Sequence, residues 1–137
     1  MEPGNSSAEK FQPGFRFARL DAIALLLIGG TALGIAFRWP LAGAVVGFVL
    51  GHFFLFCNVF RIRRVPELIW AGGFFLMASH AMISDRPDWY WPQTFLLSLV
   101  LAAGLIGRDM RHPSYHGVWW QILNPGLREW WDQNVSR

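Results

Sequence analysis

Four apolar stretches joined by short polar links constrain the fold of this chain more than any other feature. They cover Asp21–Phe37, Leu41–Phe60, Pro66–Ile83 and Pro92–Gly107. A helix needs roughly 20 apolar residues to cross the ~30 Å hydrocarbon core of a bilayer, and each stretch reaches or approaches that length. None alternates apolar and polar residues as the strands of a membrane barrel do. The sequence therefore predicts an all-α integral membrane protein with four transmembrane helices.

The composition supports a membrane location over a soluble one. Of the 137 residues, 53% are hydrophobic and only 15% are charged, whereas soluble domains carry about 25% charged residues. The net charge of +3 comes from basic residues that flank the apolar stretches. This placement is typical of membrane orientation signals, so we expect the lipid bilayer as a partner and no nucleic acid.

The links between the stretches are short, which predicts an antiparallel up-down bundle. Ten of the 12 basic residues fall in the first tail, the second link and the C-terminal tail. These ten are Lys10, Arg16, Arg19, Arg61, Arg63, Arg64, Arg108, Arg111, Arg128 and Arg137. The other two links hold only Arg38 and Arg86. Because basic segments stay in the cytoplasm, we expect both termini there. We separately expect this compact multi-pass protein to belong to a bacterial inner membrane.

The chain divides into three predicted regions. Residues 1–19 form a flexible cytoplasmic tail, residues 20–107 form the transmembrane bundle, and residues 108–137 form a cytoplasmic segment at the membrane surface. In this last region Asn124 is a predicted helix cap, and Leu127, Trp130, Trp131 and Val135 fall on one helical face. We predict an interfacial amphipathic helix anchored by tryptophans, or alternatively a docking surface for a partner subunit. The predicted anchors are Trp119, Trp120, Trp130 and Trp131.

Glycines recur on one face of each of the first two stretches. They are Gly30 and Gly34 in the first, and Gly43, Gly47 and Gly51 in the second. Small residues at this spacing allow two helix backbones to approach closely in a membrane. We expect the first two helices to pack on each other through these glycines, with self-association or binding of another subunit as the alternative.

Polar residues inside the apolar stretches are candidates for function, because a membrane makes them costly. The candidates are His52, Asn58, Glu67 and His80. His52 lies near the predicted midplane, either hydrogen-bonded to Thr31 or Ser98 or as part of a proton or substrate path. Asp21, Asn58 and Glu67 lie at one predicted depth near the cytoplasm, where Arg63, Arg64 and Arg108 could pair with the two carboxylates.

The C-terminal region contains a short motif, Arg111-His112-Pro113-Ser114-Tyr115-His116-Gly117. It resembles the Arg-His-Pro-x-Tyr-x-Gly stretch of membrane methyltransferases of the isoprenylcysteine carboxyl methyltransferase type. The resemblance implies that Arg111, His112, Pro113, Tyr115 and Gly117 help to hold S-adenosylmethionine. The chain lacks that family's preceding Gly-Pro-Tyr and its following hydrophobic helix with paired glutamates.

The rest of the sequence contains no recognisable group of catalytic residues. The single cysteine, Cys57, allows no intrachain disulfide, the sequence predicts no metal site, and nothing in it identifies a cofactor. We therefore expect a non-catalytic accessory or assembly subunit of a larger membrane complex, partnered by other membrane subunits or by itself. The alternatives are a small dimeric transporter or proton-conducting protein that uses His52, and a methyltransferase-like enzyme.

Overall fold

The computed structural model describes residues 11–134, and every regular element in that range is a helix. This confirms the all-α prediction. The elements are α1 (Arg19–Arg38), α2 (Pro40–Phe54), a π-helical turn η1 (Leu55–Val59), α3 (Arg64–Ile83), α4 (Pro87–Asp109), α5 (Trp120–Leu123) and α6 (Leu127–Asn134).

Three helical segments are long and apolar enough to cross a membrane. They are Arg19–Arg38, Pro40–Val59 and Pro87–Asp109, and together they are compatible with a multi-pass membrane protein. The last is longer than its predicted apolar stretch, because the helix begins at Pro87 and contains Pro92 internally. The fourth long helix, α3, also has 20 residues but is not among these three segments; it carries Arg64, Glu67 and His80.

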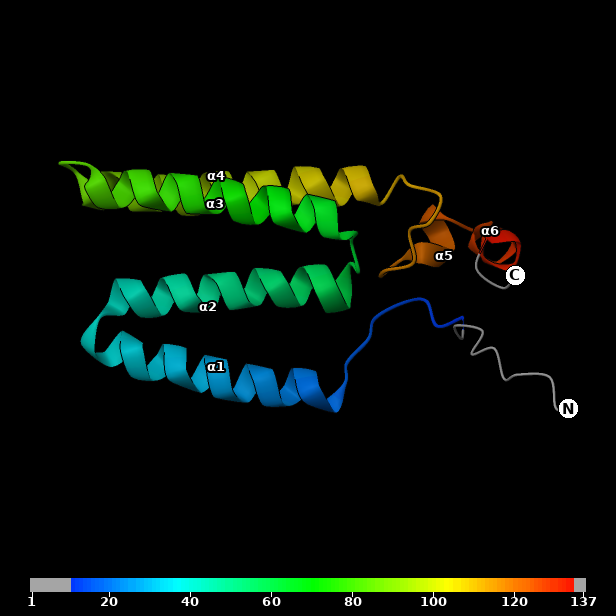
Figure 1. Cartoon of the computed structure of the whole chain (residues 1–137), viewed down its shortest axis with the longest axis horizontal. Coiled ribbons are helices and arrows are strands. Elements are labelled where there is room, and N and C mark those ends of the chain that lie inside the picture. The colour runs from blue at the N-terminus through cyan, green and yellow to red at the C-terminus, as the bar shows by residue number, and fades with distance from the viewer. Residues whose placement is uncertain (1–10, 135–137) are drawn as a thin grey trace, which may run out of the picture.

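The four long helices lie roughly parallel to the long axis of the molecule, and consecutive helices run in opposite directions (Figure 1). α1 and α2 form one hairpin around Trp39, and α3 and α4 form another around the link at Ser84–Arg86. α1 lies at the edge of this arrangement beside α2. The hairpins are the units from which the fold is built.

An aromatic core joins the two hairpins. Phe56 from η1 packs with Trp70 and Phe74 from α3, and all three side chains are buried. Phe48 of α2 lies 5.5 Å from Phe74 and 4.9 Å from Phe95 of α4, measured between ring centroids. Large rings therefore fill the space between α2 and the second hairpin, while most leucines of the four helices face outward.

The segment before α1, which belongs to the tail predicted for residues 1–19, contacts the C-terminal part of the chain. Residues 1–10 lie outside the described residues, but residues 11–18 are held by the rest of the chain. The N–H of Gly14 donates to the carbonyl of His116 at 2.7 Å, and Phe11 packs edge-on against Trp120 and Trp131. The segments on either side of the helical body thus pack on each other, which no local sequence pattern indicates.

Candidate functional site

Polar interactions concentrate at one end of the molecule, where α2 ends, α3 begins and α4 ends; we call this end the polar cap. A helix leaves its last carbonyls without partners in the helix. At the end of η1 the carbonyl of Asn58 accepts the N–H of Arg16 at 3.1 Å, and the carbonyl of Val59 accepts the N–H of Val118 at 3.0 Å. The end of α2 is therefore the point where both terminal segments attach.

Asn58 is buried in the polar cap and binds the start of α1. With its amide nitrogen turned toward the acceptors, it donates to the Arg16 carbonyl and to Asp21 Oδ2, both at 3.1 Å. The same carboxylate oxygen accepts the N–H of Ala18 at 2.7 Å. Asn58 and Asp21, for which we predicted a similar depth, are thus hydrogen-bonded, and this bond joins α1 to the end of η1.

The predicted ion pairs are corrected by the structure. We expected Arg63, Arg64 or Arg108 to pair with Asp21 or Glu67. Arg63 instead pairs with Asp109, and Glu67 accepts a weak hydrogen bond from the Cys57 thiol, with 3.9 Å between Sγ and Oε1. The reason is geometric: Asp109 ends α4 directly beside the start of α3, where Arg63 stands.

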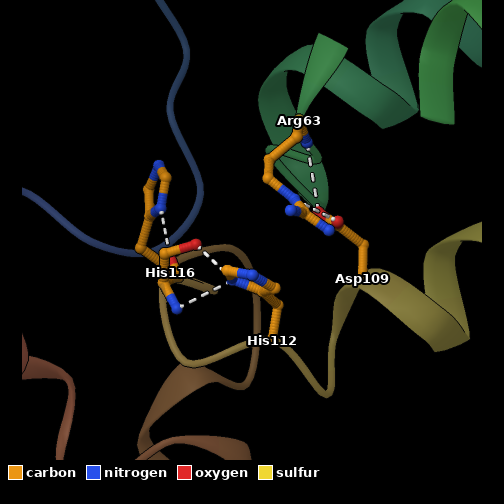
Figure 2. Close-up of polar contacts among 5 residues, drawn as sticks. Arg63, Asp109, His112 and His116 are labelled. Atoms are coloured by element: carbon orange, nitrogen blue, oxygen red, sulfur yellow. Dashed lines mark hydrogen bonds and ion pairs between the residues drawn. The ribbon is translucent and has the colours of Figure 1, made fainter. Parts of the chain in front are cut away.

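Arg63 and Asp109 form an ion pair in the polar cap (Figure 2). The Arg63 Nε donates to Asp109 Oδ1 at 2.8 Å, and the Arg63 backbone N–H donates to Oδ2 at 3.1 Å. Asp109 is 3% exposed, whereas the Arg63 side chain is 52% exposed. A buried carboxylate that accepts two donors fixes the end of α4 against the first turn of α3. Sequence reasoning missed Asp109, although a carboxylate that directly follows an apolar stretch was a usable signal.

The motif at 111–117 folds into a compact loop after α4. The N–H of Ser114 donates to His112 Nδ1 at 3.3 Å, so this nitrogen is an acceptor and also receives the Ser114 hydroxyl at 2.7 Å. His116 has the opposite arrangement, because its Nδ1 lies 2.9 Å from the Ser114 carbonyl and must donate to it. The close-up in Figure 2 shows these contacts beside the ion pair.

Tyr115 and Gly117 hold this loop against the end of α2. Tyr115 is buried and donates its hydroxyl to the Val118 carbonyl at 2.9 Å. Burial, helped by the charge of Asp109, raises the pKa of Tyr115 to about 12. A Cβ on Gly117 would overlap the Phe60 carbonyl oxygen, so only glycine allows this close approach. In this structure Tyr115 and Gly117, two of the methyltransferase-like positions, serve packing, while Arg111 and Pro113 are exposed.

His52 lies in the aromatic core rather than beside its predicted partners. Its Nδ1 is 2.9 Å from the Phe48 carbonyl of its own helix, and its ring stacks on Trp70 with centroids 4.5 Å apart. Thr31 donates to the Leu27 carbonyl, and the buried Ser98 hydroxyl finds no hydrogen-bond partner. The expected bond from His52 to Thr31 or Ser98 is therefore wrong, because the backbone carbonyl one turn earlier is nearer.

His80 lies far from His52, at the opposite end of the molecule from the polar cap. It is exposed in the last turn of α3, and its ring meets Tyr90 edge-on with centroids 4.9 Å apart. Together with Thr94 it lines a cavity of about 330 Å³ between α3 and α4. The candidates His52, Asn58, Glu67 and His80 thus occupy separate places, and only Asn58 and Glu67 belong to the polar cap.

Among the predicted packing glycines, only Gly43 brings α1 and α2 together. A Cβ there would lie 2.5 Å from the Ala36 Cβ and 2.7 Å from the Ala32 carbonyl oxygen. Gly30, Gly34, Gly47 and Gly51 face open space. Gly30 and Gly47 line an apolar groove of about 640 Å³ that is formed by α1 and α2. We name this the small-residue groove.

The tryptophans of the C-terminal segment differ from one another in environment. Trp119 is exposed and has a left-handed backbone (φ 60°), whereas Trp120, Trp130 and Trp131 are half-buried. The amphipathic face predicted for 127–135 is present in α6, with Leu127 fully buried; Val135 lies outside the described residues. Asn124 does not use its side chain to cap this helix. Its amide donates to the carbonyls of Pro113 and Tyr115 and ties the tail to the loop.

Comparison with known proteins adds no function to these observations. No family model, no curated protein and no solved structure matches the chain. Within residues 11–134, no three His, Cys, Asp or Glu side chains gather closely enough to hold a metal ion. The candidate sites are therefore the polar cap, with the buried Asp109 and its partner Arg63, and the small-residue groove.

Proposed function

We propose that this protein is a non-catalytic accessory or assembly subunit of a larger membrane complex, and that it binds another transmembrane helix through the small-residue groove. The observation that carries the proposal is the outward position of Gly30 and Gly47, which have no neighbour within 4 Å. Association of helices in lipid depends on close backbone approach at small residues. Here the residues suited to that approach are left open by the chain's own packing.

The composition of the groove fits a helix better than a polar substrate. Gly29, Ala32, Ala36 and Ala44 also line it, and its surface is almost entirely apolar. α1 lies at the edge of the molecule beside α2, so a second helix placed in the groove would contact both members of the hairpin. The groove would offer such a helix a concave surface of small side chains with few polar groups.

The proposal includes four membrane crossings, with α3 as the additional span. The exposed face of α3 is apolar, as Leu68, Phe75, Leu76 and Ile83 illustrate, and this face suits contact with lipid. Its polar residues lie near its ends, at Arg64, Glu67 and His80. Polar residues at these positions can reach the headgroup layer.

The orientation with both termini in the cytoplasm, in a bacterial inner membrane, also stands as a proposal. Among the described residues, arginines gather at the polar cap, and only Arg38 and Arg86 belong to the opposite end. The tryptophan-rich segment with α6 would then lie at the cytoplasmic membrane surface, where amphipathic helices with tryptophans bind.

The alternatives receive less support from the geometry. His52 is stacked on Trp70 and hydrogen-bonded to its own helix, an arrangement that suits a packing residue better than a proton path. Tyr115 and Gly117 of the methyltransferase-like motif face the protein interior. Neither observation favours transport or catalysis.

The direct test is native mass spectrometry of the tagged full-length chain, extracted gently from the membranes of its own host. The proposal predicts an assembly that contains at least one different membrane protein in a fixed ratio. If the chain is recovered only as a monomer at every detergent condition that preserves other complexes, the proposal is wrong.

A further inference from the structure

The cavity between α3 and α4, at the end of the molecule opposite the polar cap, is lined by a group of polar side chains. It measures about 330 Å³, which falls within the roughly 300–1,000 Å³ that small-molecule sites occupy. His80 of α3 and Tyr90, Gln93 and Thr94 of α4 line it. We call it the α3/α4 cavity.

Three of these side chains carry hydrogen-bonding groups that the chain itself leaves unused. Thr94 donates its hydroxyl to the Tyr90 carbonyl at 3.0 Å, so its donor has a partner. The side chains of His80, Tyr90 and Gln93 make no hydrogen bond with any other residue of the described range 11–134. A phenol, an amide and a neutral imidazole can each donate and accept. The cavity therefore offers hydrogen bonds to the head group of a ligand.

The polar and apolar parts of the α3/α4 cavity lie at different depths. His80 and Tyr90 are close to the link between the two helices, whereas the exposed Leu76 and Leu97 lie farther from it along the same cavity. From Tyr90 to Leu97 the helix rises about 10 Å. If α3 crosses the bilayer as proposed, the polar part lies near the membrane surface and the apolar part faces the acyl chains. This arrangement fits an amphiphile with a polar head and a hydrocarbon tail.

The lining of the cavity favours an uncharged, flat head group. The described residues that line it include no arginine, lysine or carboxylate, whereas a phosphate head group is best held by guanidinium groups. The rings of His80 and Tyr90 meet edge-on with their centroids 4.9 Å apart, and a further flat ring packs well against such rings. A quinone has a flat uncharged ring, two carbonyl oxygens that accept hydrogen bonds, and a hydrocarbon tail.

We propose that the α3/α4 cavity binds the ring of a membrane quinone. Tyr90 and Gln93 donate hydrogen bonds to its carbonyl oxygens, and the exposed His80 is a third donor at the same level. The tail lies along Leu76 and Leu97. The proposal concerns binding only. It rests on α3 as a membrane span, which is part of the proposed function, but it does not depend on the small-residue groove.

The test measures how much decylubiquinone the full-length protein, extracted gently from its own host, retains in native mass spectrometry. Tyr90→Phe and Gln93→Leu each remove a group that has no partner within the described chain, so the fold does not depend on it. Gln121→Leu is the matched control, because Gln121 is exposed in α5 at the other end of the molecule. We expect about fivefold weaker retention for each of the first two variants, the loss of one hydrogen bond, and no change for the control.

A second pair of variants tests the position of the tail. Leu97→Trp fills the apolar part of the cavity, whereas Leu99→Trp places the same ring on an exposed position of α4 outside it. We expect Leu97→Trp alone to reduce the retention of decylubiquinone.

Three outcomes would overturn the proposal. The first is a wild-type protein that retains no decylubiquinone, and the second is equal retention by wild type, Tyr90→Phe and Gln93→Leu. The third is displacement of decylubiquinone by an equal concentration of dioleoylglycerol, which would show a general lipid groove. The same spectra record whether a partner subunit is present, so loss of the quinone with the partner retained separates this proposal from the proposed function.

Discussion

The carboxylate of Asp109 lies 2.8 Å from the Nε of Arg63 and also accepts the Arg63 backbone N–H. One side chain at the end of α4 thereby satisfies a donor of the first turn of α3 and pairs with its guanidinium. Because Asp109 is buried, water replaces these contacts poorly. The second hairpin is therefore fixed at the polar cap by a contact that does not involve its apolar surface.

Replacing Asp109 by alanine should destabilise the protein. The substitution leaves the backbone N–H and the Nε of Arg63 without their acceptor, and we expect a loss of about 1–3 kcal/mol in unfolding free energy. Denaturant unfolding in detergent, followed by tryptophan fluorescence, measures it. Asp85→Ala, in the exposed link between α3 and α4, should change the stability by less than about 0.5 kcal/mol. Equal effects of the two substitutions would contradict the role of Asp109.

Gly43 should tolerate no side chain, unlike its neighbour Gly47. A Cβ at 43 meets the backbone of α1 at Ala32 and Ala36, whereas a Cβ at 47 meets open space. We expect Gly43→Ala to cost about 1–3 kcal/mol through overpacking, and Gly47→Ala to leave the stability of the isolated chain unchanged or slightly higher. Thermal unfolding of both variants in the same detergent compares them. A stable Gly43→Ala variant would show that α1 and α2 are farther apart than described.

The stability of the polar cap should depend on pH through Tyr115. Its pKa is raised to about 12 in the folded protein, from about 10 in an unfolded chain. Between these values the unfolded chain binds fewer protons than the folded one, so stability falls as the pH rises from about 10 to about 12. Tyr115→Phe should remove this fall, at a cost of about 0.5–1.5 kcal/mol at neutral pH for the lost hydrogen bond to Val118.

Tyrosinate absorbance gives a direct reading of that pKa. The chain has two tyrosines, so a Tyr90→Phe variant titrates Tyr115 alone. Ionisation near pH 10 in the folded Tyr90→Phe protein would contradict the burial of Tyr115.

His52 should act as a packing residue. Its ring stacks on Trp70 and contacts Phe48, so His52→Ala should leave a cavity and cost about 2–4 kcal/mol. His52→Phe keeps the ring and should cost less than about 1.5 kcal/mol. Proton flux into proteoliposomes should be the same for wild type and both variants. A flux that both substitutions abolish would restore the transport alternative.

Local patterns predicted the helices because apolar stretches leave few other solutions in a membrane. The boundaries were less accurate where proline stood at a stretch end, since Pro92 lies inside α4 rather than at its start. Pairing across the chain was harder to predict. Asp109 was overlooked because its partner Arg63 is distant in sequence, and Arg63 was assigned to the carboxylates that its depth suggested.

Contacts between helices were equally hard to predict for the glycines of the candidate site. Their spacing correctly marked one face of α2, but it could not say which of them would touch α1. Gly43 does so because it follows the tight turn at Trp39, while Gly47 and Gly51 lie farther along, where their Cβ positions are open. Residues 11–18 attach to the C-terminal segment through one backbone hydrogen bond, from Gly14 to His116, and through the ring of Phe11. Such contacts between distant residues leave no mark in composition or periodicity.

The measurement that tests the central claim most directly is recovery of the partner subunit with Gly47→Leu, compared with Gly104→Leu. Both glycines have open space at the Cβ position, but only Gly47 lines the small-residue groove. Each tagged variant is purified from the native host, and co-purifying membrane proteins are quantified by mass spectrometry. We predict that Gly47→Leu loses the partner while Gly104→Leu retains it. A partner that stays bound to both variants, or is lost from both, would contradict docking through the groove.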